Sequence, residues 1–341
     1  MSAKSVSSTI RPFQLRGHAR PLTHVRFNND GDLLMTTCKE GTSLLWSSYT
    51  GELLGSYEGH GGVVWSFDFT SDSRKIITAS GDMTSRLWDT ETGKELHMIS
   101  APSTVSDASF SVGNKMFFIV TVNNMNQHSS IVIYDATSFE LINRIELPRD
   151  LRFTCALWAD CNTRIIASLS DHTIVSYNVR TGETTGQATT AHKDTITDMQ
   201  MSHDGTYFIT SSRDMTAKIF DIHELSQIRV YTTDSPLNSA SIDNIKGHIF
   251  LGGGQDASQV TTTHARSGKF ETRIYHEALA EELGRVRGHF GPINTLHVSP
   301  QGTHFATGGE DGFVRLHEFD QNYHDFKIEF DENFEPSADV N

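Results

Sequence analysis

The sequence predicts an all-β fold, a seven-bladed β-propeller, because one spacing pattern recurs along the chain. Four segments begin at Gly-His or Ala-His and carry an acid 22 residues after the histidine and an aromatic ring or histidine 28 residues after it. The four histidines are His18, His60, His192 and His289. A unit of about 40 residues that repeats in this way is typical of a four-stranded propeller blade of the WD-repeat type.

The apolar residues within each repeat predict where its strands lie. Positions 7 and 9 after each histidine are apolar, and residues two apart share one face of a strand. A short turn with small or polar residues follows, such as Asp30-Gly31 and Asp204-Gly205, and a second strand carries threonine 18 residues after the histidine. The acid then begins a tight turn into a third strand that ends at the ring.

Histidine, threonine, acid and tryptophan recur together, which predicts a hydrogen-bonded network inside each of these blades. The predicted members are His18, Thr36, Glu40 and Trp46; His60, Thr78, Asp82 and Trp88; His192, Thr210 and Asp214; and His289, Thr307 and Asp311. A hydroxyl, a histidine and an acid are also the members of a nucleophilic triad. An enzyme needs one such set, whereas several equivalent sets indicate repeated strand geometry, so we expect no catalytic residues and no enzyme activity.

Three weaker repeats fill the gaps and bring the number of blades to seven. They begin near Ala101, Arg149 and Thr233. The first has a polar insertion at Asn123–Ser130, and the last has a strand at Ile249–Leu251 with Asp256 close to the acid position. The following segment Ile274–Leu283 has helix-forming residues without a 3.6-residue stripe, which leaves open a helical insertion or a long outer strand.

We expect a single domain at residues 10–330, between a flexible extension at 1–9 and a flexible acidic tail at 331–341. Residues Ile10 to Arg16 occupy the place of an outermost strand before the first repeat. We predict that this strand pairs with the last blade and thereby removes an exposed sheet edge. The competing candidate is Asp325 to Phe330, which alternates apolar and polar residues.

Composition limits the possible partners. The net charge is −14 without a lysine- and arginine-rich block, so direct, tight nucleic-acid binding is not expected. The longest apolar run, Met116–Val120, is too short to cross a membrane. The three cysteines have no CxxC spacing, which favours reduced thiols in the cytosol or nucleus over a disulfide framework. We expect a cytoplasmic protein. Histidines outside the repeats lie at unrelated spacings, so we expect neither a metal site nor a cofactor.

Several stretches match more than the general repeat pattern. They include RPFQLRGHARPLTHVRFNNDGDLL at 11–34, SYEGHGGVVWSFD at 56–68, and, within 251–320, GGGQDASQVTTT, GKFETRIYHE and EELGRVRGHFGPINT. Over nearly its full length the chain resembles the WD-repeat i subunit of eukaryotic translation initiation factor three. The glycine-rich and GKFE segments are not required by blade geometry, which makes this resemblance more specific than the fold.

The resemblance implies a non-catalytic scaffold subunit that is a monomer within a hetero-oligomer. Its expected partners are the b and g subunits of the initiation factor three complex and, indirectly, the small ribosomal subunit, with roles in initiator tRNA and mRNA recruitment and in scanning. We expect the surface near blades 5 and 6, at Asp221 and Ile219, to contact a partner. Alternatively, Asp221 is only a solvent-facing turn residue. A second hypothesis is a signalling adaptor that binds receptors or kinases.

Overall fold

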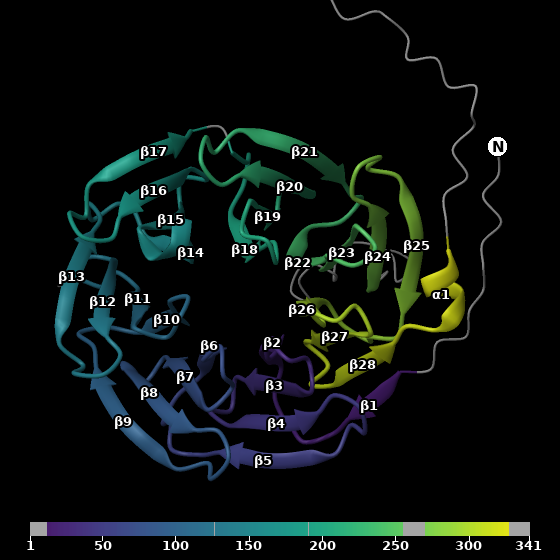
Figure 1. Cartoon of the computed structure of the whole chain (residues 1–341), viewed down its shortest axis with the longest axis horizontal. Coiled ribbons are helices and arrows are strands. Elements are labelled where there is room, and N and C mark those ends of the chain that lie inside the picture. Colours follow the sequence, from purple (N-terminus) through teal and green to yellow (C-terminus); the bar gives the residue numbers. More distant parts are fainter. Residues whose placement is uncertain (1–11, 126, 190, 255–269, 327–341) are drawn as a thin grey trace, which may run out of the picture.

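The computed structural model of the chain is a closed ring of seven four-stranded antiparallel sheets (Figure 1). It describes residues 12–125, 127–189, 191–254 and 270–326. The first strand of each repeat lies nearest the ring centre and the later strands lie progressively outward (Figure 1). The predicted seven-bladed propeller is therefore confirmed, including the three blades whose repeats are weak in sequence.

Blades 1 to 3 follow the sequence directly. Blade 1 has β2 (Leu22–Phe27), β3 (Leu33–Cys38), β4 (Ser43–Ser47) and β5 (Leu53–Tyr57); blade 2 has β6 (Val64–Phe69), β7 (Lys75–Ser80), β8 (Thr84–Asp89) and β9 (Glu95–Ser100); blade 3 has β10 (Val105–Phe110), β11 (Met116–Thr121), β12 (Ser130–Asp135) and β13 (Leu141–Glu146). Of the predicted insertion at 123–130, residues 123–125 and 127–129 lie between β11 and β12, Ser130 begins β12, and residue 126 lies outside the described residues.

Blades 4 to 7 continue the same order. Blade 4 has β14 (Phe153–Ala159), β15 (Arg164–Leu169), β16 (Ile174–Asn178) and β17 (Thr184–Ala188); blade 5 has β18 (Ile196–Met201), β19 (Tyr207–Ser212), β20 (Thr216–Asp221) and β21 (Gln227–Thr232); blade 6 has β22 (Leu237–Asp243), β23 (His248–Gly253), β24 (Glu271–His276) and β25 (Glu282–Arg287); blade 7 has β26 (Ile293–Val298), β27 (His304–Gly309), β28 (Val314–Glu318) and β1 (Phe13–Leu15). A short 3₁₀ turn, η1 (Asp160–Asn162), joins β14 to β15.

The amino-terminal strand β1 closes the ring. It pairs antiparallel with β28, with Phe13 opposite Leu316 and Leu15 opposite Val314. Leu15 is buried with Leu22, Leu44 and Trp46 of blade 1. This pairing gives blade 7 its fourth strand and joins it to blade 1. Of the competing segment 325–330, Asp325 ends helix α1, and residues 327–330 lie outside the described residues, as do 1–11 and 331–341.

Helix α1 (Gln321–Asp325), which the sequence did not predict, fastens the end of blade 7 to blade 6 (Figure 1). The Tyr323 hydroxyl lies 2.6 Å from Asp243 Oδ2 and 2.8 Å from His248 Nδ1. The Tyr323 ring stacks on Phe319 with a centroid separation of 4.1 Å. Because the hydroxyl has one proton, which it donates to the carboxylate, His248 Nδ1 must donate to the tyrosine oxygen.

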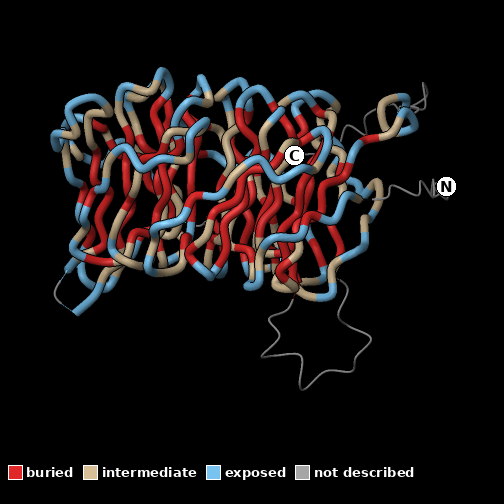
Figure 2. Tube along the Cα trace, turned by 90° about the horizontal axis from the view of Figure 1, so that it is seen from below, coloured by how far each residue is buried: buried red, intermediate tan, exposed pale blue. Residues whose placement is uncertain are grey.

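The hydrophobic core lies between neighbouring blades. Each blade packs its buried strand faces against the next one; for example, Met35 and Leu45 of blade 1 share a cluster with Phe67 and Trp88 of blade 2. Seen from the side, the buried residues lie between the two faces of the ring, and the exposed residues follow those faces (Figure 2). This burial explains why the apolar offsets in the repeat are so regular.

One expectation about blade 6 is corrected by the structure, and another concerns a residue outside the described chain. The segment 274–283 is neither a helical insertion nor one long strand: it contains the end of β24, a turn and the start of β25. Its helix-forming residues are overridden because both flanking strands pair in the sheet of blade 6. The predicted acid Asp256 lies outside the described residues. No described helix is long and apolar enough to span a membrane.

Candidate functional site: repeated blade networks and a charged turn

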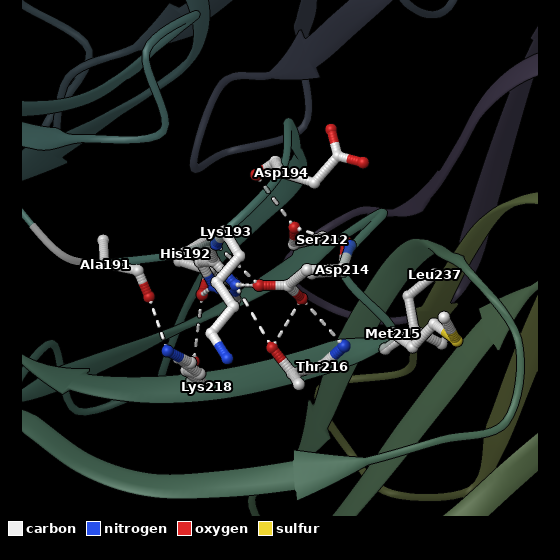
Figure 3. Close-up of polar contacts among 12 residues, drawn as sticks. Ala191, His192, Lys193, Asp194, Ser212, Asp214, Met215, Thr216, Lys218 and Leu237 are labelled. Atoms are coloured by element: carbon white, nitrogen blue, oxygen red, sulfur yellow. Dashed lines mark hydrogen bonds and ion pairs between the residues drawn. The ribbon is translucent and has the colours of Figure 1, made fainter.

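The His–Thr–Asp network is complete in blade 5 (Figure 3). His192 lies in the loop before β18, with Nδ1 2.9 Å from Asp214 Oδ2 and Nε2 2.8 Å from Thr210 Oγ1. The backbone N–H of Lys193 donates to the same carboxylate oxygen at 2.9 Å, and the Thr216 hydroxyl donates to Asp214 Oδ1 at 2.6 Å. These bonds join the loop before the inner strand to the turn between the second and third strands.

Charge and protonation follow from this arrangement. The Asp214 carboxylate is an acceptor only, so His192 Nδ1 donates to it, and His192 Nε2 forms the hydrogen bond with the Thr210 hydroxyl. Burial alone would raise the pKa of Asp214, but hydrogen bonds from His192, the Lys193 N–H and Thr216 outweigh it and hold that pKa below its usual value. The carboxylate therefore remains ionised while every bond of the network is made.

The histidine contacts with threonine and aspartate recur in blades 2 and 7. His60 lies 2.9 Å from Asp82 and 2.7 Å from Thr78, and the Trp88 indole donates to Thr78 Oγ1 at 2.9 Å. In blade 7, His289 Nδ1 lies 3.1 Å from Asp311 Oδ1, and His289 Nε2 lies 2.8 Å from Thr307. The predicted partners therefore meet in both blades. The ring positions of blades 5 and 7 hold Phe220 and His317 and make no equivalent bond to the threonine among the described contacts.

Blade 1 departs from the prediction at its acid. His18 Nε2 lies 2.7 Å from Thr36 and Trp46 donates to that hydroxyl at 2.9 Å, but Glu40 is exposed and His18 Nδ1 is buried without a partner. Including Glu40 in the network was wrong. Glutamate is one methylene longer than aspartate, so its carboxylate does not fit the short loop that Asp82 and Asp214 form with their own turn.

The networks do not have the geometry of a nucleophilic site. Thr78 and Thr210 are completely buried, and Thr307 is 1% exposed. Each hydroxyl already bonds to its histidine, and a buried hydroxyl without an approach path cannot reach a substrate. Among the described residues, the repeated sets thus hold strands and turns together.

A second set of polar contacts joins the inner strands of neighbouring blades around the central channel. The backbone N–H of Val25 donates to Thr295 Oγ1 at 3.1 Å, and that of Leu296 donates to Ser239 Oγ at 3.1 Å. Asp68 likewise accepts from the backbone N–H of Phe110 at 2.9 Å. In these contacts a side chain of one blade satisfies a backbone donor on the inner edge of a neighbouring blade, a donor that would otherwise be unpaired.

The channel contains a cavity of about 230 Å³ with acidic side chains from two blades. Burial raises the pKa of Asp107 to about 6 and also raises that of Asp198. Both carboxylates accept hydrogen bonds from serine hydroxyls, at 2.7 Å from Ser66 and 2.6 Å from Ser239. No group of three or more His, Cys, Asp or Glu side chains suited to a metal is found within the described part of the chain.

The two residues expected at a partner surface have different environments. Ile219 is only 3% exposed and packs with Tyr231 and Leu251 between blades 5 and 6, so its side chain offers almost no surface for the expected contact with a partner. Asp221 is partly exposed at the end of β20. Its Oδ1 accepts the backbone N–H groups of His223 at 2.7 Å and Glu224 at 2.8 Å. Asp221 therefore shapes the turn 221–226, whatever else it binds.

Sequence reasoning missed the charged residues around this turn. Arg164 of blade 4 donates from Nη2 to the backbone oxygen of Ile222 at 3.0 Å and forms an ion pair with Asp160. Asp160 Oδ1 also lies 3.2 Å from His223 Nδ1. Arg164 and Ile222 are 58 residues apart, and Asp160 and His223 are 63 apart. Each of these two pairs joins different blades, so no local spacing indicates their contact.

The ring of seven sheets and its His–Thr–Asp networks define the chain as a WD-repeat β-propeller. The solved β-propeller domain of Myceliophteria thermophila Cps50 (Swd1) has the same fold, with a TM-score of 0.76 at 16% identity over 90% of this chain and 98% of that one. The EIF3I family model matches residues 10–329. The chain therefore belongs to the family of subunit I of eukaryotic translation initiation factor 3.

Relatives from distant organisms match along almost their whole length. The subunit I proteins of Kluyveromyces lactis and Schizosaccharomyces pombe are each 42% identical to this chain, which covers 97% and 99% of them. These alignments include 96% and 93% of this chain. The protein of Bombyx mori is 39% identical over 94% of this chain and 99% of its own length.

Proposed function

We propose that this protein is a non-catalytic scaffold subunit of the initiation factor 3 complex. Family membership over residues 10–329 supports this function most directly. The buried hydroxyls of the repeated networks agree with it, because they leave rigid blades rather than a reactive centre. In this role the protein binds the b and g subunits and supports assembly of the small-ribosomal-subunit preinitiation complex in the cytoplasm.

Affinity purification of the tagged protein from nuclease-treated cytosol at physiological salt tests this proposal. We expect near one-to-one recovery of the b and g subunits, because contacts between proteins survive the removal of RNA. Recovery of receptors or kinases in their absence would instead support a signalling adaptor. Loss of the two subunits after nuclease treatment would contradict a scaffold held together by protein contacts.

We also propose that Asp221 binds a cationic side chain of a partner. The substitution Asp221→Arg reverses the charge and should weaken binding of the purified b subunit by roughly tenfold or more, because like charges then face each other. Asp135→Arg is the matched control, since Asp135 Oδ1 also accepts two backbone N–H groups of its own turn, at 2.8 Å each. Equal affinities for the two variants, measured by calorimetry, would assign Asp221 only a turn-forming role.

A further inference from the structure

The connection between the first two strands of blade 4 has an unusual backbone. Asp160, Cys161 and Asn162 have φ values of 47°, 49° and 71°, so three consecutive non-glycine residues are left-handed. The corresponding turns of blades 5, 6 and 7 contain one left-handed residue each, and it is Gly205, Gly247 or Gly302. Left-handed backbone is unfavourable for residues with a Cβ atom and persists only where surrounding contacts hold it.

Two neighbouring blades hold this turn. On the side of blade 3, Asn162 Oδ1 accepts the Val112 N–H at 2.8 Å and Asn162 Nδ2 donates to the Val112 oxygen at 2.7 Å. On the side of blade 5, Asp160 binds both Arg164 and His223. The strained turn is therefore anchored on both sides.

Arg164 links the turn 160–162 to blade 5. Its side chain is 14% exposed, and its guanidinium binds Asp160, while Nη2 donates to the Ile222 oxygen and Nη1 lies 3.5 Å from the His223 oxygen. A guanidinium has donors directed along several fixed lines, so it can bind a carboxylate and backbone carbonyls together. These carbonyls belong to the residues that directly follow Asp221.

Arg164 supplies a charged contact between blades 4 and 5 on this face of the ring. Blades 2 and 3 are joined at the same face by uncharged bonds, from Asn114 to Ser71 at 2.8 Å and from the Ser71 N–H to Asn114 at 2.9 Å. At the channel, Cys155 and Leu157 of blade 4 face Met199 and Met201 of blade 5. Leucine and methionine side chains supply no hydrogen bonds like those between Ser66 and Asp107.

We infer that Arg164 is a positioning residue: held by the left-handed turn 160–162, it fixes the turn 221–226 and thereby sets the orientation of the Asp221 carboxylate. The partner-binding consequence of this inference rests on the proposed role of Asp221. The structural part, that Arg164 orders the turn, does not.

Hydrogen exchange on the isolated full chain tests the structural part. Arg164→Gln should raise the exchange rates of the His223, Glu224 and Leu225 amides by roughly tenfold, because the carbonyls that hold this turn lose their donors. Arg144→Gln is the matched control, since Arg144 pairs with Glu146 inside blade 3. Unchanged exchange at 223–225, in a variant with a native circular dichroism spectrum, would overturn the inference.

Two further variants keep the result interpretable. Asp160→Asn preserves the side-chain shape but removes the charge, so we expect a smaller increase at the same amides. Arg164→Lys retains the charge but not the fork of donors, so protection should be restored only in part. Full protection in Arg164→Lys would show that charge alone orders the turn and would contradict the role given to the guanidinium.

A double-mutant cycle tests the consequence for binding. Arg164→Gln should reduce the affinity for the b subunit several-fold in the wild-type background and have little further effect in Asp221→Arg, because both changes act through one carboxylate. Additive effects would show that Arg164 acts independently of Asp221 and would overturn the positioning role. If Asp221→Arg leaves affinity unchanged while exchange at 223–225 still rises in Arg164→Gln, the proposed binding role fails and the ordering of the turn stands.

Discussion

Blades 1 and 5 begin with the same histidine and threonine but differ in how completely their networks are bonded. In blade 5, Asp214 accepts from His192, Lys193 N and Thr216. In blade 1, Glu40 is exposed and His18 Nδ1 is buried without a partner. The two acids differ by one methylene group. The histidine beside aspartate has partners for both ring nitrogens and the histidine of the glutamate blade has a partner for only one, although both blades adopt the same fold. The comparison indicates that the blade is determined by its strands, and that the network adds stability to it.

Removing the acid from blade 5 should have the largest effect. Asp214→Ala leaves His192, the Lys193 N–H and Thr216 without their shared acceptor, in a site where the Asp214 side chain is 7% exposed. We expect the free energy of unfolding to fall by about 3 kcal/mol, since each unpaired buried polar group is costly. Urea denaturation measures this change. Glu40→Ala is the control and should alter stability by less than about 0.5 kcal/mol; similar losses in both variants would contradict the comparison.

The tryptophan of blade 2 tests the other end of the network. Trp88→Phe removes the donor to Thr78 and reproduces the ring found at Phe220 of blade 5. We expect a loss of about 2 kcal/mol, from one hydrogen bond and the smaller buried ring, measured as a lower thermal midpoint. Phe220→Leu, which removes no hydrogen bond, separates the packing contribution. A midpoint unchanged by Trp88→Phe would show that the indole bond adds nothing to this blade.

The dependence of the free energy of unfolding on pH should contain a contribution from His18 of blade 1. Burial lowers the pKa of His18 from 6.5 to about 4, so between these values the unfolded chain binds a proton that the folded chain does not. The free energy of unfolding therefore falls as the pH drops from 6.5 towards 4, and above 6.5 this group contributes no slope. We expect His18 to account for about 1–2 kcal/mol of the loss.

Urea denaturation at pH 7 and pH 4.5 measures this contribution. His18→Gln removes the titrating group, so the difference between the two pH values should be smaller in the variant than in the wild type. Other buried histidines, such as His317 with a pKa lowered by burial to about 3, keep their part of the slope in both proteins. The same pH difference in both proteins would exclude His18 as a source of acid sensitivity.

These comparisons also show how far the sequence could lead. Repeats at histidine, threonine and acid predicted the blades because each position satisfies one local requirement of a strand or turn. The exposed position of Glu40 and the burial of Ile219 depend on packing that residue type alone does not define. The turn 160–162 is still harder to predict from the sequence. Its left-handed backbone is held by Val112 and His223, which come close to the turn only after the ring has closed.

Restoring the network of blade 1 should give the smallest change in stability among these variants. Glu40→Asp supplies the shorter acid, and the neighbouring groups that bind Asp214 have counterparts here: Thr42 corresponds to Thr216, and the Ala19 N–H corresponds to that of Lys193. A carboxylate in this place should accept from His18 Nδ1, which is buried without a partner. We expect stabilisation of about 0.5–1 kcal/mol and a thermal midpoint higher by roughly 1–3 °C.

The variant should also raise the pKa of His18, because an adjacent carboxylate favours the protonated imidazole. The acid sensitivity of blade 1 would then diminish together with the gain in stability, and titration of the His18 ring by NMR measures the first effect while the thermal midpoint measures the second. A gain in stability without a shift in the His18 titration would show that the new carboxylate does not lie beside His18. A loss of stability would mean that blade 1 has a turn geometry that rejects aspartate, and that the difference between blades 1 and 5 lies in the backbone rather than in the length of one side chain.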